Sequence, residues 1–282
     1  MRPPATNKTK RSKITRHPRV VSPQPPFSTV DEAIAEIAAG RMIIVVDDED
    51  RENEGDLTLA AEVCTPEMVA FIRKHASGVI CVPMTTERLE QLDLPQMVVR
   101  NEARLGTAFT MSVDAREGIT TGISAADRAR TIRVLADPNA TAQDLVKPGH
   151  MFPLQARDGG VLVRAGQTEA AVDLCRLAGM QPVGVICEIT NPDGSMSRLP
   201  ELKRFAKKHG LKMITVKDLI AYRMAREQMV ERVASAKLPT KYGAFTVHGY
   251  KARFGNTEAE HVALTMGDIA DGKPVLVRVH SE

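Results

Sequence analysis

The chain has 282 residues, of which 43% are hydrophobic, 26% are charged and 4% are aromatic, with no Trp. This length suits one large domain, or one domain and part of another, and the few aromatic side chains argue against a stacking surface for nucleic-acid bases. No apolar stretch is long enough to span a bilayer, and none near the start resembles a signal-peptide core, so we expect no membrane association.

The formal net charge of +3 is unevenly distributed along the chain. Residues 1–26 carry seven Lys or Arg side chains, six prolines and no acid, so removing them leaves about −4 for the rest. We predict a disordered, solubilising basic tail over residues 1–26, with a transit peptide or a weak polyanion contact as alternatives. The acidic remainder argues against a nucleic-acid-binding core. Isolated cysteines without a CxxC pair indicate buried thiols in a reducing cytoplasm.

Order is predicted to begin near Phe27. Thr29 and Glu32 have the spacing of a helix capping box, and Gly40 marks the end of that helix. The apolar, β-branched run Met42–Val46 then predicts a buried strand.

Seven carboxylates fall within the ten residues Asp47–Asp56, directly after this strand. Their mutual repulsion is tolerable if the loop is solvated, or if a cation or a polar substrate is bound there. A solvated surface loop is the simpler alternative. Otherwise the run indicates a hard-cation or polyol site that contains one cation of its own, Arg51.

Helices and strands alternate along the rest of the main segment. Thr65 before a proline marks a helix start, and Ser124 opens a helix that ends before Pro138. This alternation predicts an α+β fold, with an α/β-like mixed sheet and flanking helices. The other predicted elements are strands at Val79–Met84, Ala108–Val113, Val161–Val163, Val183–Ile189 and Lys212–Val216, and helices from Thr168 to Gly179, over Leu199–His209 and over Lys217–Val233.

Three segments carry further candidate site residues. His150 lies between two prolines, in a loop predicted to be stiff enough to aim an imidazole for proton transfer, unless it is an ordinary loop histidine. Arg164–Thr168 lead into a helix start that favours an anion, or in which Thr168 simply caps the helix. Glu188 is a lone carboxylate within an apolar strand, and is either functional or faces solvent on an edge strand.

The character of the sequence changes after Pro239. Tyr242–Gly249 and Val275–Val279 are predicted to be β segments. Some 45 residues are too few to bury a core unaided. We therefore expect a single main domain over residues 27–234, followed by an incomplete β-rich segment over residues 235–282.

Between about Phe27 and Arg232 the motifs together resemble 3,4-dihydroxy-2-butanone 4-phosphate synthase, an enzyme family of riboflavin biosynthesis. The segments that match are DDEDRENEGD, GTAFTMSVDAREGITTGISAADRARTIR, PGHMFPL, RAGQTEAAVDL and GVICEITNPDGSM. The tail, through Arg278–Glu282, resembles the opening of GTP cyclohydrolase II and stops before that family's zinc-binding cysteines. The resemblance therefore implies the truncated start of a second domain, as in bifunctional riboflavin biosynthesis proteins.

This resemblance implies a lyase that converts D-ribulose 5-phosphate to 3,4-dihydroxy-2-butanone 4-phosphate and formate with Mg²⁺ or Mn²⁺. It also implies a homodimer with the active site near the subunit interface. The resemblance further implies that His150 and Glu188 are catalytic and that Glu52 and Gln167 occupy the metal-ligand positions. The implied substrate contacts are Arg51, Glu52, Asp56, Arg164, Ala165, Gly166, Gln167, Thr168 and Glu188.

Gln167 is a departure from the family pattern. The family segment reads Arg-x-Gly-His-Thr, and its histidine is the second protein ligand of the metal. Mg²⁺ accepts an amide carbonyl oxygen, but glutamine is a weaker donor and transfers no protons. We therefore expect reduced metal affinity and rate, with a catalytically impaired binding or scaffold subunit as the alternative.

Overall fold

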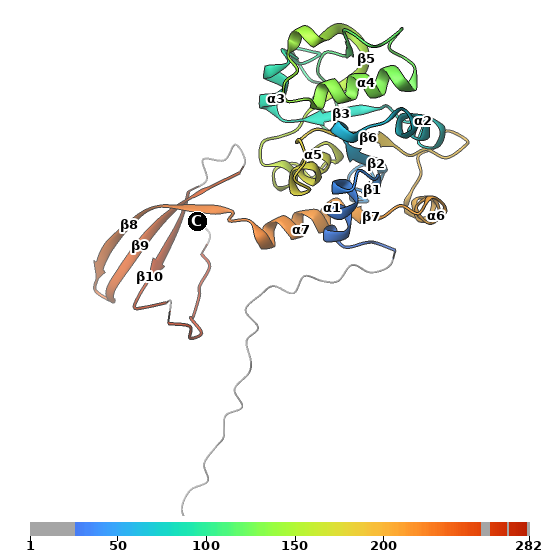
Figure 1. Cartoon of the computed structure of the whole chain (residues 1–282). Coiled ribbons are helices and arrows are strands. Elements are labelled where there is room, and N and C mark those ends of the chain that lie inside the picture. Colours follow the sequence, from blue (N-terminus) through green and yellow to red (C-terminus); the bar gives the residue numbers. More distant parts are fainter. Residues whose placement is uncertain (1–25, 255–259, 270, 281–282) are drawn as a thin grey trace, which may run out of the picture.

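The structure is a computed structural model that describes residues 26–254, 260–269 and 271–280 (Figure 1). The predicted disordered tail lies outside the described residues, except for Pro26. A seven-stranded mixed sheet with helices on both faces forms the main body, and a separate three-stranded sheet follows it. The predicted fold class is therefore confirmed.

The main sheet has the strand order β4-β5-β3-β6-β2-β1-β7. Pairs β1–β7 and β3–β5 are parallel, whereas β1–β2, β2–β6, β3–β6 and β4–β5 are antiparallel. The strands are β1 (Ile43–Val46), β2 (Gly55–Ala60), β3 (Cys81–Met84), β4 (Val113–Ala115), β5 (Leu145–Gln155), β6 (Gly184–Glu188) and β7 (Met213–Thr215).

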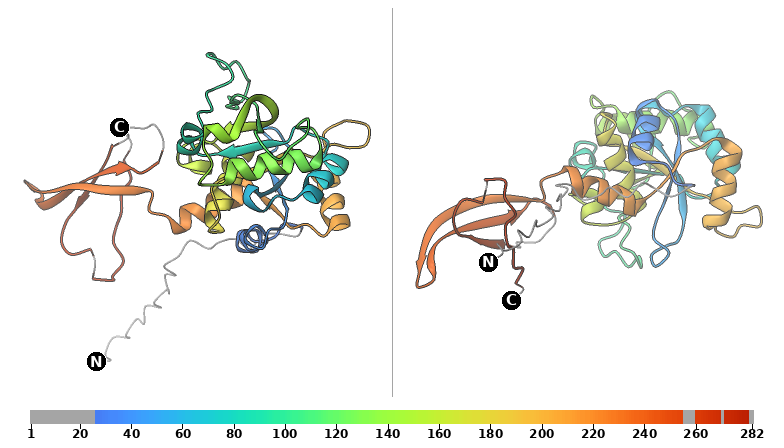
Figure 2. Two further views of the ribbon diagram at one scale, coloured as in Figure 1. Left: turned by 45° about the horizontal axis from the view of Figure 1, so that its top comes forward. Right: turned by 90° about the horizontal axis from the view of Figure 1, so that it is seen from below.

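Two apolar clusters cover opposite faces of this sheet because successive strand residues point to opposite sides. Ile44 and Leu57 enter the cluster that contains α2, α4 and α6, whereas Ile43 and Val45 enter the cluster that contains α1, α5 and α7. Figure 2 shows these helices around the sheet. The helices are α1 (Val30–Ala38), α2 (Pro66–His75), α3 (Thr86–Gln91), α4 (Ala125–Ala136), α5 (Gln167–Leu177), α6 (Leu199–His209) and α7 (Val216–Arg226), with 3₁₀ turns η1 (Ala61–Val63), η2 (Ala142–Asp144) and η3 (Gly160–Leu162).

Local capping signals placed several helices correctly. Thr29 Oγ1 accepts the Glu32 backbone N–H at 3.1 Å, and the Thr29 N–H donates to the Glu32 carboxylate at 2.8 Å, which completes the predicted capping box. Thr65 and Ser124 cap α2 and α4 through their hydroxyl groups. These predictions are confirmed because capping depends on residues within one turn of each other.

Predictions that depended on tertiary pairing were less accurate. The predicted strand Ala108–Val113 is wrong, because regular pairing begins only at β4, and Val161–Val163 lies in and just after the η3 turn. The last main-body helix ends at Arg226 instead of Val233, since strand pairing resumes at Val230. Val275–Val279 forms no strand within the described part of the chain. β2 and α3 were not predicted.

The second sheet follows α7 directly and projects from the main body (Figure 2). It is antiparallel, in the order β10-β9-β8. Val233, Val262 and Leu264 are more than half exposed, so this sheet packs against little else among the residues that the structure describes. Its strands are β8 (Val230–Thr240), β9 (Gly243–Ala252) and β10 (Glu260–Thr265). No helix in the described ranges has the length and apolar character needed to cross a membrane.

A pair of histidines joins α2 to α6. The ring centroids of His75 and His209 lie 4.8 Å apart, packed with two phenylalanines. Loss of solvent, followed by the nearby positive charges of Lys74 and Lys208, lowers the pKa of His75, and loss of solvent with His75 and Lys208 lowers that of His209. The folded state therefore holds these protons less tightly than the unfolded chain does.

We expect the free energy of unfolding to fall as the pH drops through the unfolded histidine pKa of about 6.5, because the unfolded chain then binds more protons. Urea unfolding at about pH 7.5 and about pH 5.5 measures the difference. His209→Phe should reduce this pH dependence, whereas His261→Phe on the exposed face of β10 should not. Equal pH dependence in all three proteins would contradict the assignment.

Candidate active site

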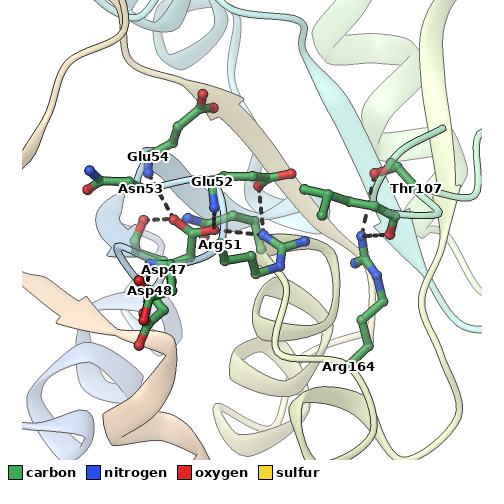
Figure 3. Close-up of polar contacts among 12 residues, drawn as sticks. Asp47, Asp48, Arg51, Glu52, Asn53, Glu54, Thr107 and Arg164 are labelled. Atoms are coloured by element: carbon green, nitrogen blue, oxygen red, sulfur yellow. Dashed lines mark hydrogen bonds and ion pairs between the residues drawn. The ribbon is translucent and has the colours of Figure 1, made fainter.

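The acidic run is the hairpin loop between β1 and β2. Val46 pairs with Gly55, so Asp47–Glu54 form the loop. The buried carboxylate of Asp47 accepts the backbone N–H groups of Glu52 at 3.1 Å and Glu54 at 2.8 Å (Figure 3). Asp47 therefore fixes the backbone of the loop through these two hydrogen bonds. Its role was not predicted, although it is the first acid after the strand.

Arg51 lies among these carboxylates, as predicted. Its Nη1 atom is 2.7 Å from Asp47 Oδ2 and 2.7 Å from Glu52 Oε2 (Figure 3). Both Arg51 and Glu52 remain partly exposed. This part of the loop is thus ordered and partly neutralised, whereas residues 48–50 are exposed, as the alternative of a solvated loop expects.

Asp56 and Glu188 form a pair of carboxylates on adjacent strands. They are direct cross-strand partners on β2 and β6, so their side chains leave the same face of the sheet. Asp56 is buried, and this burial, together with the negative charges of Glu188 and Glu52, raises its pKa well above the usual range. Glu188 Oε2 accepts the Val79 N–H at 2.9 Å. β6 lies inside the sheet, so the edge-strand alternative for Glu188 is wrong.

Arg164 is held just before the N-terminus of α5. Its Nη1 atom is 2.6 Å from the buried Glu169 carboxylate. Its Nη2 atom is 3.4 Å from Thr107 Oγ1, a contact that Figure 3 shows. α5 begins at Gln167, and its N-cap is Gly166, which offers no side-chain bond. The alternative that Thr168 caps this helix is therefore wrong, and the first backbone N–H groups of α5 are not bonded by a capping side chain.

The side-chain oxygen of Gln167, at the start of α5, has no hydrogen-bond partner among the described residues. Gln167 Nε2 donates to the Val45 carbonyl at 3.0 Å, while the unpartnered Oε1 atom is buried. Val45 is the cross-strand partner of Asp56, so the start of α5 lies beside the carboxylate pair. A buried, unsatisfied carbonyl oxygen is unusual in folded proteins and is suited to receive a ligand.

The residues present fit a hard divalent cation. The Glu52 carboxylate and the Gln167 carbonyl are oxygen donors of the kind that Mg²⁺ prefers. Across the described residues, no group of three or more His, Cys, Asp or Glu side chains is arranged to hold a metal. Mg²⁺ usually keeps several waters and takes only one or two carboxylates from the protein.

His150 lies within β5, so the prediction of a Pro-framed loop is wrong. The ring is oriented instead by Asp114 of β4, whose Oδ2 atom is 2.7 Å from His150 Nδ1 and whose Oδ1 atom accepts the His150 backbone N–H at 3.0 Å. A Cβ atom at Gly122 would lie 2.2 Å from Asp114 Oδ2, so only glycine fits there. Sequence reasoning missed Asp114; its signal is an acid between the apolar residues Val113 and Ala115.

Strand register places the imidazole and the carboxylates at one end of the sheet. Phe152 pairs with Cys81, which pairs with Ile186. Two residues further in the same direction lie His150 on β5 and Glu188 on β6. These two backbones are separated by two strand spacings, roughly 10 Å. The structure therefore places His150, Glu188, Asp56, the acidic loop and the start of α5 at one end of the sheet.

Comparison with known families agrees with this arrangement. The family of 3,4-dihydroxy-2-butanone 4-phosphate synthase matches residues 31–222, and GTP cyclohydrolase II matches residues 231–282. The suspected combination of a synthase domain with a partial cyclohydrolase domain is therefore confirmed.

Individual relatives are similar over most of the chain. The riboflavin biosynthesis protein RibBA of Salinispora arenicola is 57% identical over 91% of this chain, and the chain spans 60% of that protein's length. A 3,4-dihydroxy-2-butanone 4-phosphate synthase of Pseudomonas aeruginosa is 54% identical over 90% of this chain and 69% of its own length.

Solved structures show the same fold. A two-domain 3,4-dihydroxy-2-butanone 4-phosphate synthase from A. baumannii, RibBX, is 50% identical, with a TM-score of 0.78 over 85% of this chain and 70% of that one. A synthase solved in complex with two magnesium ions is 48% identical, with a TM-score of 0.67 over 70% of this chain and 96% of its own. The chain therefore belongs to the 3,4-dihydroxy-2-butanone 4-phosphate synthase family.

Proposed function

We propose that the chain is a Mg²⁺-dependent lyase of riboflavin biosynthesis that converts D-ribulose 5-phosphate to 3,4-dihydroxy-2-butanone 4-phosphate and formate. The observation that carries this proposal is that three kinds of group lie at one end of the sheet. They are oxygen atoms that can bind a metal, side chains that can transfer protons, and a positively charged site that can bind an anion. Two relatives bear the names of enzymes from this pathway, which supports the proposal.

The phosphate of the substrate would bind at the start of α5. Arg164 supplies a charged fork of donors, and the N–H groups of Gln167 and Thr168 add the positive end of the helix. Ala165 and Gly166 form the intervening turn. A Cβ atom at Gly166 would lie 2.4 Å from Arg164 Nη1, so a larger residue there would displace this guanidinium.

The reaction begins with loss of a proton beside the ketone, which gives an enediol, and continues through loss of water and rearrangement of the carbon skeleton. A water is then added back and one carbon leaves as formate, so no net water is consumed. Several proton transfers are needed, and carboxylates with an imidazole suit them. We assign these transfers to Glu188 and His150. Asp114 accepts from His150 Nδ1, which leaves Nε2 free to take or give a proton. Asp56 and Arg51 would contact the sugar hydroxyl groups.

Glu52 and the orphaned Oε1 atom of Gln167 would hold the divalent cation. Bound Mg²⁺, or Mn²⁺, supplies positive charge that stabilises a developing enediolate oxygen. A relative solved with two magnesium ions supports the choice of metal.

Replacing Gln167 by histidine should increase Mg²⁺-dependent formate release at limiting metal. An imidazole can donate one N–H to the Val45 carbonyl, as Gln167 Nε2 does now. This hydrogen bond would orient the ring and make its other nitrogen a more basic ligand for the metal. Magnesium titrations of formate release compare the two proteins. No gain would show that this position is not a metal ligand.

The decisive assay incubates the purified chain with ribulose 5-phosphate and Mg²⁺ and measures formate. We expect release that stops when the metal is chelated. A folded protein that releases no formate above background would favour the alternative of a catalytically silent binding or scaffold subunit. The comparisons lend that alternative no support.

We further propose a homodimer with the site near the subunit interface, to be tested by light scattering. The His150 side chain is 44% exposed in the single chain, which leaves it accessible to a partner.

We also propose a main domain over residues 27–234 and a second part over residues 235–282. β8 already begins at Val230, so the second sheet starts within the first range. Four free, buried cysteines support a cytoplasmic location.

A further inference from the structure

The acidic loop is contacted by a residue from a distant part of the chain. Arg198 directly precedes α6, and its Nη1 atom donates to the Glu52 carbonyl at 2.8 Å and also to the Asn53 carbonyl. The same atom is 4.0 Å from the Glu54 carboxylate. One guanidinium therefore holds two successive carbonyl groups of a loop that lies 145 residues earlier in the sequence.

α6 is itself packed tightly against the end of this loop. A Cβ atom at Gly55 would lie 2.5 Å from Leu202 Cδ1, and Leu202 is fully buried. The Arg198 backbone N–H bonds the Glu201 carboxylate at 3.2 Å, which orders the first turn of α6. Arg198 is therefore presented from a firmly seated helix start.

The loop needs such support for two reasons. Its carboxylates repel one another, and Asn53 adopts a left-handed backbone conformation with φ of 56°, which is costly for a residue with a side chain. Arg198 adds a positive charge and satisfies the two carbonyl groups that flank the Cα atom of Asn53, those of Glu52 and of Asn53 itself. It does so without contacting the Glu52 carboxylate, which pairs with Arg51 through Oε2 and stays partly exposed.

We propose that Arg198 is a positioning residue for the proposed reaction, which clamps the Glu52–Asn53 peptide so that the Glu52 carboxylate is held ready for the divalent cation. This inference rests on the proposed function for its catalytic consequence. Its structural content, an ordered loop that binds a divalent cation, holds independently of any turnover.

Arg198→Ala should raise the Mg²⁺ concentration for half-maximal formate release by about 10-fold or more, the usual effect of removing a residue that supports a metal ligand. The kcat at saturating Mg²⁺ should change much less, because no group that touches the substrate is removed. A purely structural role would instead lower kcat and the folded fraction together. Arg198→Lys should be intermediate, since it keeps the charge but loses the paired donors.

Arg204→Ala is the matched control. Arg204 lies within α6 and is exposed, and its guanidinium pairs with the Glu201 carboxylate at 2.7 Å. This substitution removes one positive charge from α6 without touching the loop. Its Mg²⁺ dependence should equal that of the parent chain.

Two further measurements need no activity. Amide hydrogen exchange over residues 48–54 should be faster in Arg198→Ala than in Arg204→Ala or the parent, and calorimetric Mn²⁺ binding should be weaker. Unchanged loop exchange and Mn²⁺ affinity would overturn the proposal. The parent chain could release no formate while the Arg198 variants still show faster loop exchange and weaker Mn²⁺ binding. That result would refute the proposed reaction and still support the positioning role of Arg198. If Arg198→Ala does not fold, the same comparisons with Arg198→Lys decide the matter.

Discussion

Replacing Arg164 by alanine is expected to raise the KM for ribulose 5-phosphate by about 100-fold, because charge-assisted hydrogen bonds to a phosphate are worth about 1.5–3 kcal/mol each. Arg164 is fixed by Glu169 and Thr107 in front of α5, so its loss removes the only side-chain cation that we assign to the phosphate seat. Steady-state formate release over a range of substrate concentrations measures the effect. The kcat should fall less than kcat/KM.

The substitution leaves Glu169, which is 1% exposed, without its ion pair. An unpaired buried carboxylate costs about 3–5 kcal/mol and threatens folding. The double variant Arg164→Ala/Glu169→Gln avoids this cost and should show the same rise in KM. Arg176→Ala, near the far end of α5, is the control and should behave as the parent. A folded double variant with unchanged KM would show that the phosphate does not bind here.

Replacing Asp56 by asparagine should make the protein more stable and nearly inactive. Burial and the neighbouring carboxylates raise the pKa of Asp56, so the folded state holds this proton more tightly than the unfolded chain. The free energy of unfolding contributed by this residue therefore decreases as the pH rises above the unfolded pKa of about 3.9. At neutral pH the fold must either bury this charge or bind a proton to neutralise it. Both cost free energy, and asparagine avoids that cost while keeping the shape.

We expect a gain of about 1–3 kcal/mol, and each kcal/mol corresponds to roughly 2–4 °C in Tm for a domain of this size. Thermal unfolding between about pH 5 and about pH 8 should show the gain growing with pH, as the sign of the pKa shift requires. Asp50→Asn, at an exposed position of the same loop, should alter neither Tm nor formate release. A less stable Asp56→Asn protein would contradict the assignment of a destabilising buried charge.

These two variants test opposite sides of one site. Arg164 is an ordered cation that pairs with the buried Glu169, whereas Asp56 and Glu188 are crowded carboxyl groups on adjacent strands. This crowding is costly in the fold, and under the proposed function a metal and a sugar phosphate would compensate it when they bind. The loop clamp by Arg198 belongs to the same arrangement, since it supports the crowded carboxylates from behind.

Several features followed from sequence alone because they depend on neighbours in the chain. The capping box at Thr29 set the start of α1, and α6 was predicted with the bounds that the structure has. The acidic run after an apolar strand and the Arg164–Thr168 helix start located two parts of the site. The order of these motifs along the chain was also sufficient to identify the family.

Only the tertiary structure decided which side chains meet. Asp114 orients His150 across a β4–β5 bulge, Asp47 orders the loop through hydrogen bonds to its backbone, and Arg198 reaches that loop from 145 residues beyond Asn53. β2 and β5 also escaped prediction, because their residues become strands by pairing with partners distant in sequence. Local propensity is set within a few residues, whereas strand register and long-range hydrogen bonds arise only when the whole sheet closes, and these bring the site together.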